Sequence, residues 1–182
     1  IEVGVKFRTS TDGVISGLRF YKGASNTGTH VGHLWTDNGT LLGSATFINE
    51  TTTGWQTVAF TPPIPVTANT VYVASYHTDT GNYALSRPFF STGYSNSPLY
   101  AFANGEVLVG NGVYRYGPSA FPNQTWDSSN YWVDVLFRMN QPEPTPTEVP
   151  PPPPTNTPLP PPPPTATEAP PPTNTPLPPP PP

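Results

Sequence analysis

The stretch that decides the fold is Ile1-Glu2-Val3-Gly4-Val5-Lys6-Phe7-Arg8, at the start of the chain. Its odd-numbered residues are apolar, whereas Glu2, Lys6 and Arg8 lie at alternate positions between them. Successive side chains of a β-strand point to opposite sides of the sheet. The stretch therefore predicts a half-buried strand, with one face in the core and the other in water.

The same alternation recurs along residues 1–140. Further strands are expected at 14–22, 30–36, 40–48, 55–60, 70–77, 82–85 and 131–138, with irregular chain over 86–130. Turn sequences such as Asp37-Asn38-Gly39 separate them, and three prolines at 62, 63 and 65 exclude an inner position for the strand before them. No apolar period of 3.6 residues is found. These features predict an all-β domain over residues 1–140, a jelly-roll-like antiparallel β-sandwich.

Residues 141–182 have a different composition. Of these 42 residues 23 are proline, and none is aromatic or basic. Proline fixes φ near about −65° and has no N–H to donate, so an extended polyproline II tail is expected. The sequence of 154–164 recurs at 172–182, a shift of 18 residues. Because polyproline II has three residues per turn, Leu159 and Leu177 share a face and are the expected tail contacts.

Charge and composition exclude several classes of protein. The net charge is −4 and 10% of the residues are charged, which leaves no basic patch for nucleic acid. No apolar run is long enough to span a membrane. Cysteine is absent, which excludes disulfides and thiol chemistry. The abundance of Thr, Ser, Asn and Gly predicts an extracellular or cell-surface location.

Several segments of the sequence resemble those of one bacterial family, the domain-of-unknown-function family numbered 4082. They are found at 15–23, 26–32, 34–35, 54–56, 71–77, 112–114 and 130–135, within residues 1–140. The resemblance implies a secreted bacterial surface protein, of the kind found beside carbohydrate-active or immunoglobulin-like modules, and it carries no catalytic residues with it. Members usually have further residues before the strand that matches 1–8, so one edge of the sandwich is expected to lack its usual cover.

Candidate chemistry is sparse. His30 and His33 are three apart in a strand, so they point to opposite faces and cannot share a metal ion. No spacing pairs two carboxylates for glycosidase chemistry, and the Gly-x-Ser-x-Gly motif is absent. We therefore expect no enzyme, no metal and no cofactor. Turn aspartates at 12, 37 and 79 are expected to hydrogen-bond their turn backbone, with a calcium site as the alternative.

Aromatic residues give the strongest binding signal. Aromatic residues crowd the last third of the chain and include Tyr94 and Tyr100. The candidates for a ligand platform, or for docking of the tail, are Trp126, Trp132, Tyr131, Tyr114 and Tyr116. Exposed rings stack on sugars, and Tyr and Trp also bind proline-rich segments. The alternative for each ring is a place in the core. Threonines beside proline are candidates for O-glycosylation: Thr155, Thr157, Thr165, Thr167, Thr173 and Thr175.

Three functions fit these features. The first is a non-enzymatic extracellular structural protein, a subunit of a filament or fibre in which the tail packs on neighbouring subunits, so that the chain self-associates into a homopolymer. The second is a carbohydrate-binding or adhesion module on a proline-rich stalk. The third is a passive spacer domain in a larger surface protein.

Overall fold

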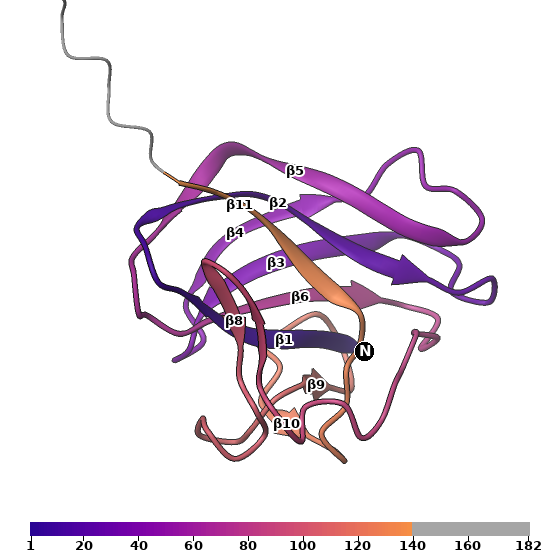
Figure 1. Ribbon diagram of the computed structural model, residues 1–182. Helices are drawn as coiled ribbons and strands as arrows, with labels where there is room; N and C mark the ends of the chain where they lie inside the picture. Colours follow the sequence, from indigo (N-terminus) through magenta and orange to yellow (C-terminus); the bar gives the residue numbers. More distant parts are fainter. Residues whose placement is uncertain (140–182) are drawn as a thin grey trace, which may run out of the picture. The chain divides into compact units, whose positions relative to one another are not determined.

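Two antiparallel sheets packed face to face form the described part of the chain (Figure 1). The structure is a computed structural model and describes residues 1–139. Its strands are β1 (Glu2–Thr9), β2 (Gly13–Lys22), β3 (His30–Thr36), β4 (Leu41–Thr46), β5 (Gly54–Val66), β6 (Tyr72–Thr78), β7 (Tyr94–Asn96), β8 (Leu99–Ala101), β9 (Val113–Arg115), β10 (Gln124–Thr125) and β11 (Val133–Met139).

The two sheets differ in size. The larger sheet has eight strands in the order β10-β9-β1-β6-β3-β4, with β8 also paired to β1 and β7 to β8. The smaller sheet has the order β11-β2-β5. Residues 1–139 contain no helix, which confirms the all-β prediction. The described residues accordingly offer no helix long and apolar enough to cross a membrane.

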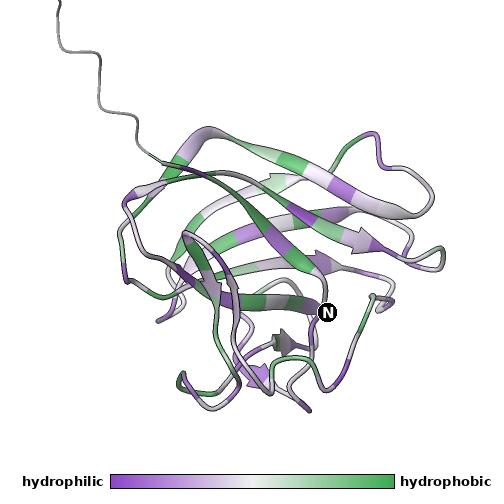
Figure 2. Ribbon diagram, in the orientation of Figure 1, coloured by the Kyte–Doolittle hydropathy of each residue, from purple (hydrophilic) through white to green (hydrophobic). Residues whose placement is uncertain are grey.

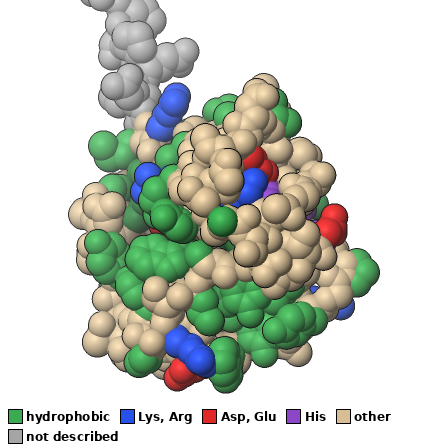
Figure 3. Space-filling view, turned by 90° about the vertical axis from the view of Figure 1, so that its right-hand side faces the viewer, with side chains coloured by type: hydrophobic (Ala, Val, Ile, Leu, Met, Phe, Trp, Pro, Cys, Tyr) green, Lys and Arg blue, Asp and Glu red, His purple; other side chains and the backbone are tan. Residues whose placement is uncertain are grey.

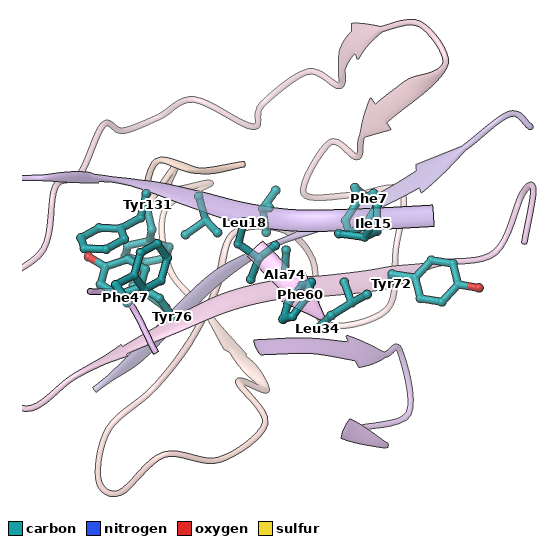
Figure 4. Packing of buried hydrophobic residues seen from close by; sticks show 14 of the residues in the cluster. Phe7, Ile15, Leu18, Leu34, Phe47, Phe60, Tyr72, Ala74, Tyr76 and Tyr131 are labelled. Carbon is teal, nitrogen blue, oxygen red and sulfur yellow. The ribbon is translucent and has the colours of Figure 1, made fainter. Parts of the chain in front are cut away.

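The core lies between the sheets and is rich in aromatic rings. Phe20 of β2 stacks on Tyr76 of β6 at 4.1 Å between ring centroids, and Phe47 meets Phe20 edge-on at 4.8 Å. Aliphatic side chains from both sheets fill the space beside them (Figure 4). Hydropathy alternates along the strands that contribute them, as the sequence predicts (Figure 2). Burial of one such side chain contributes about 1.5–3 kcal/mol.

Strand β1 is buried on both faces, so the prediction of a half-buried strand is wrong. Glu2 is 0% exposed and Lys6 is 4% exposed, although both lie on the face turned away from the core. Loops from the second half of the chain cover this face. Lys6 Nζ donates to the carbonyl of Leu108 at 2.8 Å, and Ser119 Oγ donates to Glu2 Oε2 at 3.0 Å. The covering loops lie far from β1 in sequence, and the alternation within β1 cannot reveal them.

Three other strand predictions need correction. Strand β5 continues through its prolines to Val66 because it pairs only with β2. Its register shifts on the way, since Ala59 pairs with Gly17 whereas Ile64 pairs with Ile15. An edge position tolerates residues without an N–H. Residues 82–85 form no strand, whereas 86–130, expected to be irregular, contain β7 to β10. These four strands have two or three residues each, too short for an alternation to show.

A buried polar network lies beside the aromatic core. His30 is 0% exposed, and its Nδ1 lies 2.8 Å from Glu50 Oε1. Its Nε2 lies 2.8 Å from Asn26 Oδ1, so both ring nitrogens face acceptor oxygens. Lys22 Nζ donates to Glu50 Oε2 at 2.6 Å. Glu50 therefore joins β2 to β3, because it pairs with the ammonium of Lys22 in β2 and binds the imidazole of His30 in β3.

Replacing Glu50 by glutamine should destabilise the domain strongly. Glu50→Gln leaves the buried ammonium of Lys22 without a counter-charge, and breaking a buried pair costs about 3–5 kcal/mol. Urea unfolding followed by tryptophan fluorescence measures the change. Asp127→Asn, at an exposed carboxylate that lies 3.8 Å from Arg87, is the matched control. A loss for Glu50→Gln no larger than that of the control would contradict the role given to this network.

Candidate functional site

The five predicted platform aromatics do not form one surface. Tyr131 is 3% exposed and belongs to the core. Trp126 is 50% exposed and lies under the guanidinium of Arg87, 4.0 Å from its ring centroid. Tyr116 is 67% exposed and meets the half-buried Tyr114 edge-on at 5.6 Å. Trp132 lines a cleft to which the other four do not contribute.

Tyr131 therefore corrects one site prediction. Its ring packs edge-on against Tyr83 at 5.4 Å, and Tyr114 lies 6.3 Å away on the other side. Burial is the main cause that raises the pKa of Tyr131 to about 12, so the phenol is neutral at physiological pH. A side chain in this position fills the core and is not available to a ligand.

The main cleft has a volume of about 510 Å³, and it lies between β11 and the β7–β8 hairpin. This size is in the range of small-ligand sites. Its lining comes from β1, β2, β7, β8, β11 and the loop before β7: Val5, Phe7, Arg19, Phe89, Phe90, Tyr94, Asn96, Leu99, Tyr100, Ala101, Asn130, Trp132, Val133, Asp134 and Val135. Hydrophobic side chains also gather into broad areas on the side of the domain seen in Figure 3.

One wall of the cleft is a fixed aromatic cluster. Phe89 and Trp132 pack at 5.7 Å, and Trp55 packs edge-on against Trp132 at 6.4 Å. The Trp132 indole N–H donates to Ser86 Oγ at 3.0 Å, which fixes the orientation of the ring. The wall can therefore receive a ligand without first ordering its own rings, which lowers the entropic cost of binding.

An ion pair stands beside this wall. Arg19 Nη2 lies 2.7 Å from Asp134 Oδ2, and the same guanidinium lies 4.5 Å from the ring centroid of Trp55. Both charged side chains are more than 40% exposed. The pair thus offers N–H donors and carboxylate acceptors next to apolar rings, the combination that orients a polar ligand in an apolar site.

The opposite rim is held by Tyr100 and Glu106. The Tyr100 hydroxyl donates to the Glu106 carboxylate at 2.8 Å, and the Ala103 N–H donates to the same group at 2.7 Å. The Ala103 bond, followed by the Tyr100 bond, lowers the pKa of Glu106, and the hydrogen bond to Glu106 raises the pKa of Tyr100. Arg8 lies over the Tyr100 ring at 5.2 Å. These contacts fix the ring at the rim.

A second polar cluster covers the outer face of the larger sheet, and no pattern in the sequence predicts it. Glu2 of β1 accepts a hydrogen bond at Oε1 from His33 Nδ1, 2.9 Å away, and another from Ser75 Oγ. His30 and His33 do lie on opposite faces, as expected, since His30 packs on Phe20 of the core. Among residues 1–139, no group of three or more His, Cys, Asp or Glu side chains could hold a metal ion.

The three turn aspartates bind other parts of the chain, so the prediction that they cap their own turns is wrong. Asp12 Oδ1 accepts from the N–H of Ala68, in another loop, at 2.8 Å. Asp37 pairs with Lys6 Nζ at 2.7 Å, and Asp79 lies 3.1 Å from His77 Nε2. Each aspartate ties its turn to a residue that the turn sequence does not contain.

The predicted tail contacts and glycosylation sites lie outside the described residues. They are Leu159 and Leu177, with Thr155, Thr157, Thr165, Thr167, Thr173 and Thr175.

Comparison with known proteins gives one match. Residues 1–133 match the model of a family described as "Domain of unknown function (DUF4082)". The chain belongs to this family. No curated protein matches the chain. No solved structure matches it either.

The match places the cleft almost wholly within the DUF4082 region, since only Asp134 and Val135 of its lining lie beyond residue 133. Trp132, Tyr94 and Tyr100 all belong to the aromatic residues that the sequence singles out, although only Trp132 is among the five platform candidates, and Arg19 was not expected. The alternation in 14–22 places Arg19 on the face opposite Leu18, which is the one signal that could have suggested it. The strands that carry Tyr94 and Tyr100 are too short to recognise, so the sequence could not show that these rings share a cleft with Trp132.

The rim of the DUF4082 cleft should depend on pH. A lowered pKa means that folding stabilises the Glu106 carboxylate. This contribution is present above the ordinary pKa, near 4.5, and is lost as the pH falls through the lower pKa of the folded state. An NMR titration of the side-chain carboxyl of Glu106 measures that pKa. Tyr100→Phe removes one donor and should raise it, but not to 4.5, because the Ala103 N–H still donates.

A pKa of Glu106 that does not change in Tyr100→Phe would contradict this account of the rim. Tyr116→Phe, at another exposed tyrosine, is the control and should leave the Glu106 titration unchanged.

Proposed function

We propose that the protein is an extracellular structural protein of the bacterial cell surface, in which the proline-rich segment of one copy binds the aromatic cleft of another. The observation that supports this function is the cleft of about 510 Å³ walled by Phe89, Tyr94 and Trp132. Proline-rich segments bind aromatic-lined grooves because they are ordered before binding and lose little entropy.

The cleft continues as a groove, which an extended segment requires. A second hollow of about 460 Å³ is lined by Pro98, Leu136 and Phe137 among others. The two hollows share Asn96, Leu99 and Val135, so together they follow β11 along most of its length. Strand β11 pairs with β2 on one side only. Its other edge therefore lies along the groove and is open to an extended partner.

Charge also favours this partner. Residues 141–182 contain three glutamates and no basic residue. Two arginines, Arg19 and Arg138, line the groove, and since Asp134 pairs with Arg19 the lining keeps one net positive charge. A contact between the segment of one copy and the groove of the next uses two different surfaces, so it builds an open filament unless the rotation between copies closes a ring.

Self-association should require both the segment and the cleft. The full chain is expected to form oligomers or filaments in analytical ultracentrifugation and electron microscopy, and a chain ending at Glu143 is expected to stay monomeric. Tyr94→Ala, in the cleft wall, should weaken association roughly tenfold, equivalent to about 1.4 kcal/mol. Tyr116→Ala is the matched control, because Tyr116 is similarly exposed but does not line the cleft.

Filaments formed by the shortened chain would contradict the proposal, as would equal effects of the two tyrosine variants. A peptide of residues 154–164 added to the shortened chain separates the segment from the rest of the fold. It should change the tryptophan fluorescence of the unsubstituted domain, and more weakly that of Tyr94→Ala.

A carbohydrate-binding or adhesion module is the second candidate. The observation that favours it is the Arg19–Asp134 pair beside Trp55 and Trp132, because sugars stack on rings while their hydroxyl groups bind charged side chains. The ligand would occupy the same cleft, so the two functions compete for one surface.

Glycan binding has its own test. A glycan array probed with the chain ending at Glu143 should show at least one bound sugar if this candidate is right. Asp134→Asn should abolish that signal, and Asp127→Asn, at an exposed aspartate outside the cleft, should keep it. An array without signal, together with peptide binding, would reject the candidate.

The jelly-roll class of the sandwich is also a proposal. It is supported by the path of the chain, which passes from one sheet to the other after β1, β2, β4, β5 and β10. Repeated crossing between two sheets is typical of jelly rolls.

A further inference from the structure

A chain of polar side chains leads from the surface to a buried carboxylate on the outer face of the larger sheet. Glu2 of β1 is 0% exposed and His33 of β3 is 6% exposed. Ser119, in the loop between β9 and β10, is exposed to solvent. The three residues come from segments far apart in the sequence and meet in a region separate from the cleft.

The hydrogen bonds determine which nitrogen of His33 carries a proton. A carboxylate only accepts hydrogen bonds, so the contact of 2.9 Å between Glu2 Oε1 and His33 Nδ1 requires a proton on Nδ1. In the neutral ring, Nε2 then has a lone pair, and it lies 3.5 Å from Ser119 Oγ. A hydroxyl, a ring nitrogen and a carboxylate in this order are the parts of an activated nucleophile.

The carboxylate is itself held in position. Ser75 Oγ donates to Glu2 Oε1 at 2.5 Å, and the Trp35 indole N–H donates to Ser75 Oγ at 2.8 Å. Packing of Trp35 against His33, with 5.3 Å between ring centroids, also orients the imidazole. Such supporting contacts keep the acceptor nitrogen directed at the serine.

One polar atom of the cluster has no partner. His77 Nδ1 is buried and makes no hydrogen bond in the described part of the chain. It lies 3.5 Å from Glu2 Oε2, the oxygen that also accepts from Ser119. A buried nitrogen without a partner is costly, because it has lost its hydrogen bonds to bulk water. Phe121, 5.9 Å from Trp35, adds apolar surface at this place.

We propose that Ser119, His33 and Glu2 form a nucleophilic site that reacts with carboxylic esters. Ser119 Oγ bonds to the ester carbonyl carbon while its proton passes to His33 Nε2. The ester C–O bond then breaks, and the leaving alkoxide takes that proton and departs as an alcohol. Water repeats the sequence on the acyl-serine, releases the carboxylic acid and returns the proton to Ser119. The net reaction consumes one ester and one water.

The shorter contact of Ser119 is to Glu2 Oε2, at 3.0 Å. The hydroxyl proton must therefore turn about the Cβ–Oγ bond toward His33 before it can be transferred. Distances between a nucleophile and its base are often longer before the substrate binds. Glu2 acts through His33 and is a positioning residue.

The test uses the full chain and a fluorophosphonate probe, which forms an Oγ–P bond as fluoride leaves. Mass spectrometry should find one adduct per chain, on Ser119. Ser119→Ala should carry none, and Ser91→Ala, at another exposed serine, should be labelled like the unsubstituted chain. An unlabelled Ser119, or equal labelling of Ser91 and Ser119, would overturn the proposal.

Release of p-nitrophenol from p-nitrophenyl acetate tests the role of His33. His33→Gln should slow both release and labelling roughly 100-fold, within the range of general-base catalysis. Circular dichroism establishes whether this variant is folded. A folded His33→Gln that reacts as fast as the unsubstituted chain would reject the assignment of the base. If His33→Gln is unfolded, the comparison of Ser119→Ala with Ser91→Ala decides.

Discussion

The structure depends on one constraint, which is that the polar groups on the outer face of β1 must find partners away from water. Glu2 and Lys6 are both buried there. A buried charge is tolerated when it is paired and hydrogen-bonded, and otherwise costs several kcal/mol. Lys6 forms an ion pair with Asp37 and donates a hydrogen bond to the carbonyl of Leu108. Glu2 accepts hydrogen bonds from His33, Ser75 and Ser119. The long loops of the second half of the chain are shaped by this need, and they in turn make β1 a central strand.

The same loops explain why the chain has two sites of different character. The cleft is bounded by short strands and rings, so it suits a ligand recognised by shape and stacking. The Glu2 cluster is a closed set of hydrogen bonds that reaches solvent through Ser119. Both are built on β1, whose Val5 and Phe7 line the cleft from one face while Glu2 lies on the other. One strand thus supports apolar recognition and polar chemistry in a single domain.

Much of the fold could be predicted from local patterns, and the sites largely could not. Alternation located most of the long strands and the inward direction of Leu18 and Phe20, because strand period is a local property. Burial of the polar face of β1 was missed, since its cover comes from more than 100 residues away. Trp132 was found by its residue type. His33 and Ser119 meet only through tertiary packing, and no spacing in the sequence encodes their distance.

The prolines of β5 have a consequence for the geometry of assembly. The smaller sheet has two borders, β5 and β11. In the last part of β5, Pro62, Pro63 and Pro65 lack the N–H groups that an added strand would need, so that part of the border is closed to extension. The border along β11 carries no such block. A strand could therefore be added along the full length of β11, but only along the first part of β5.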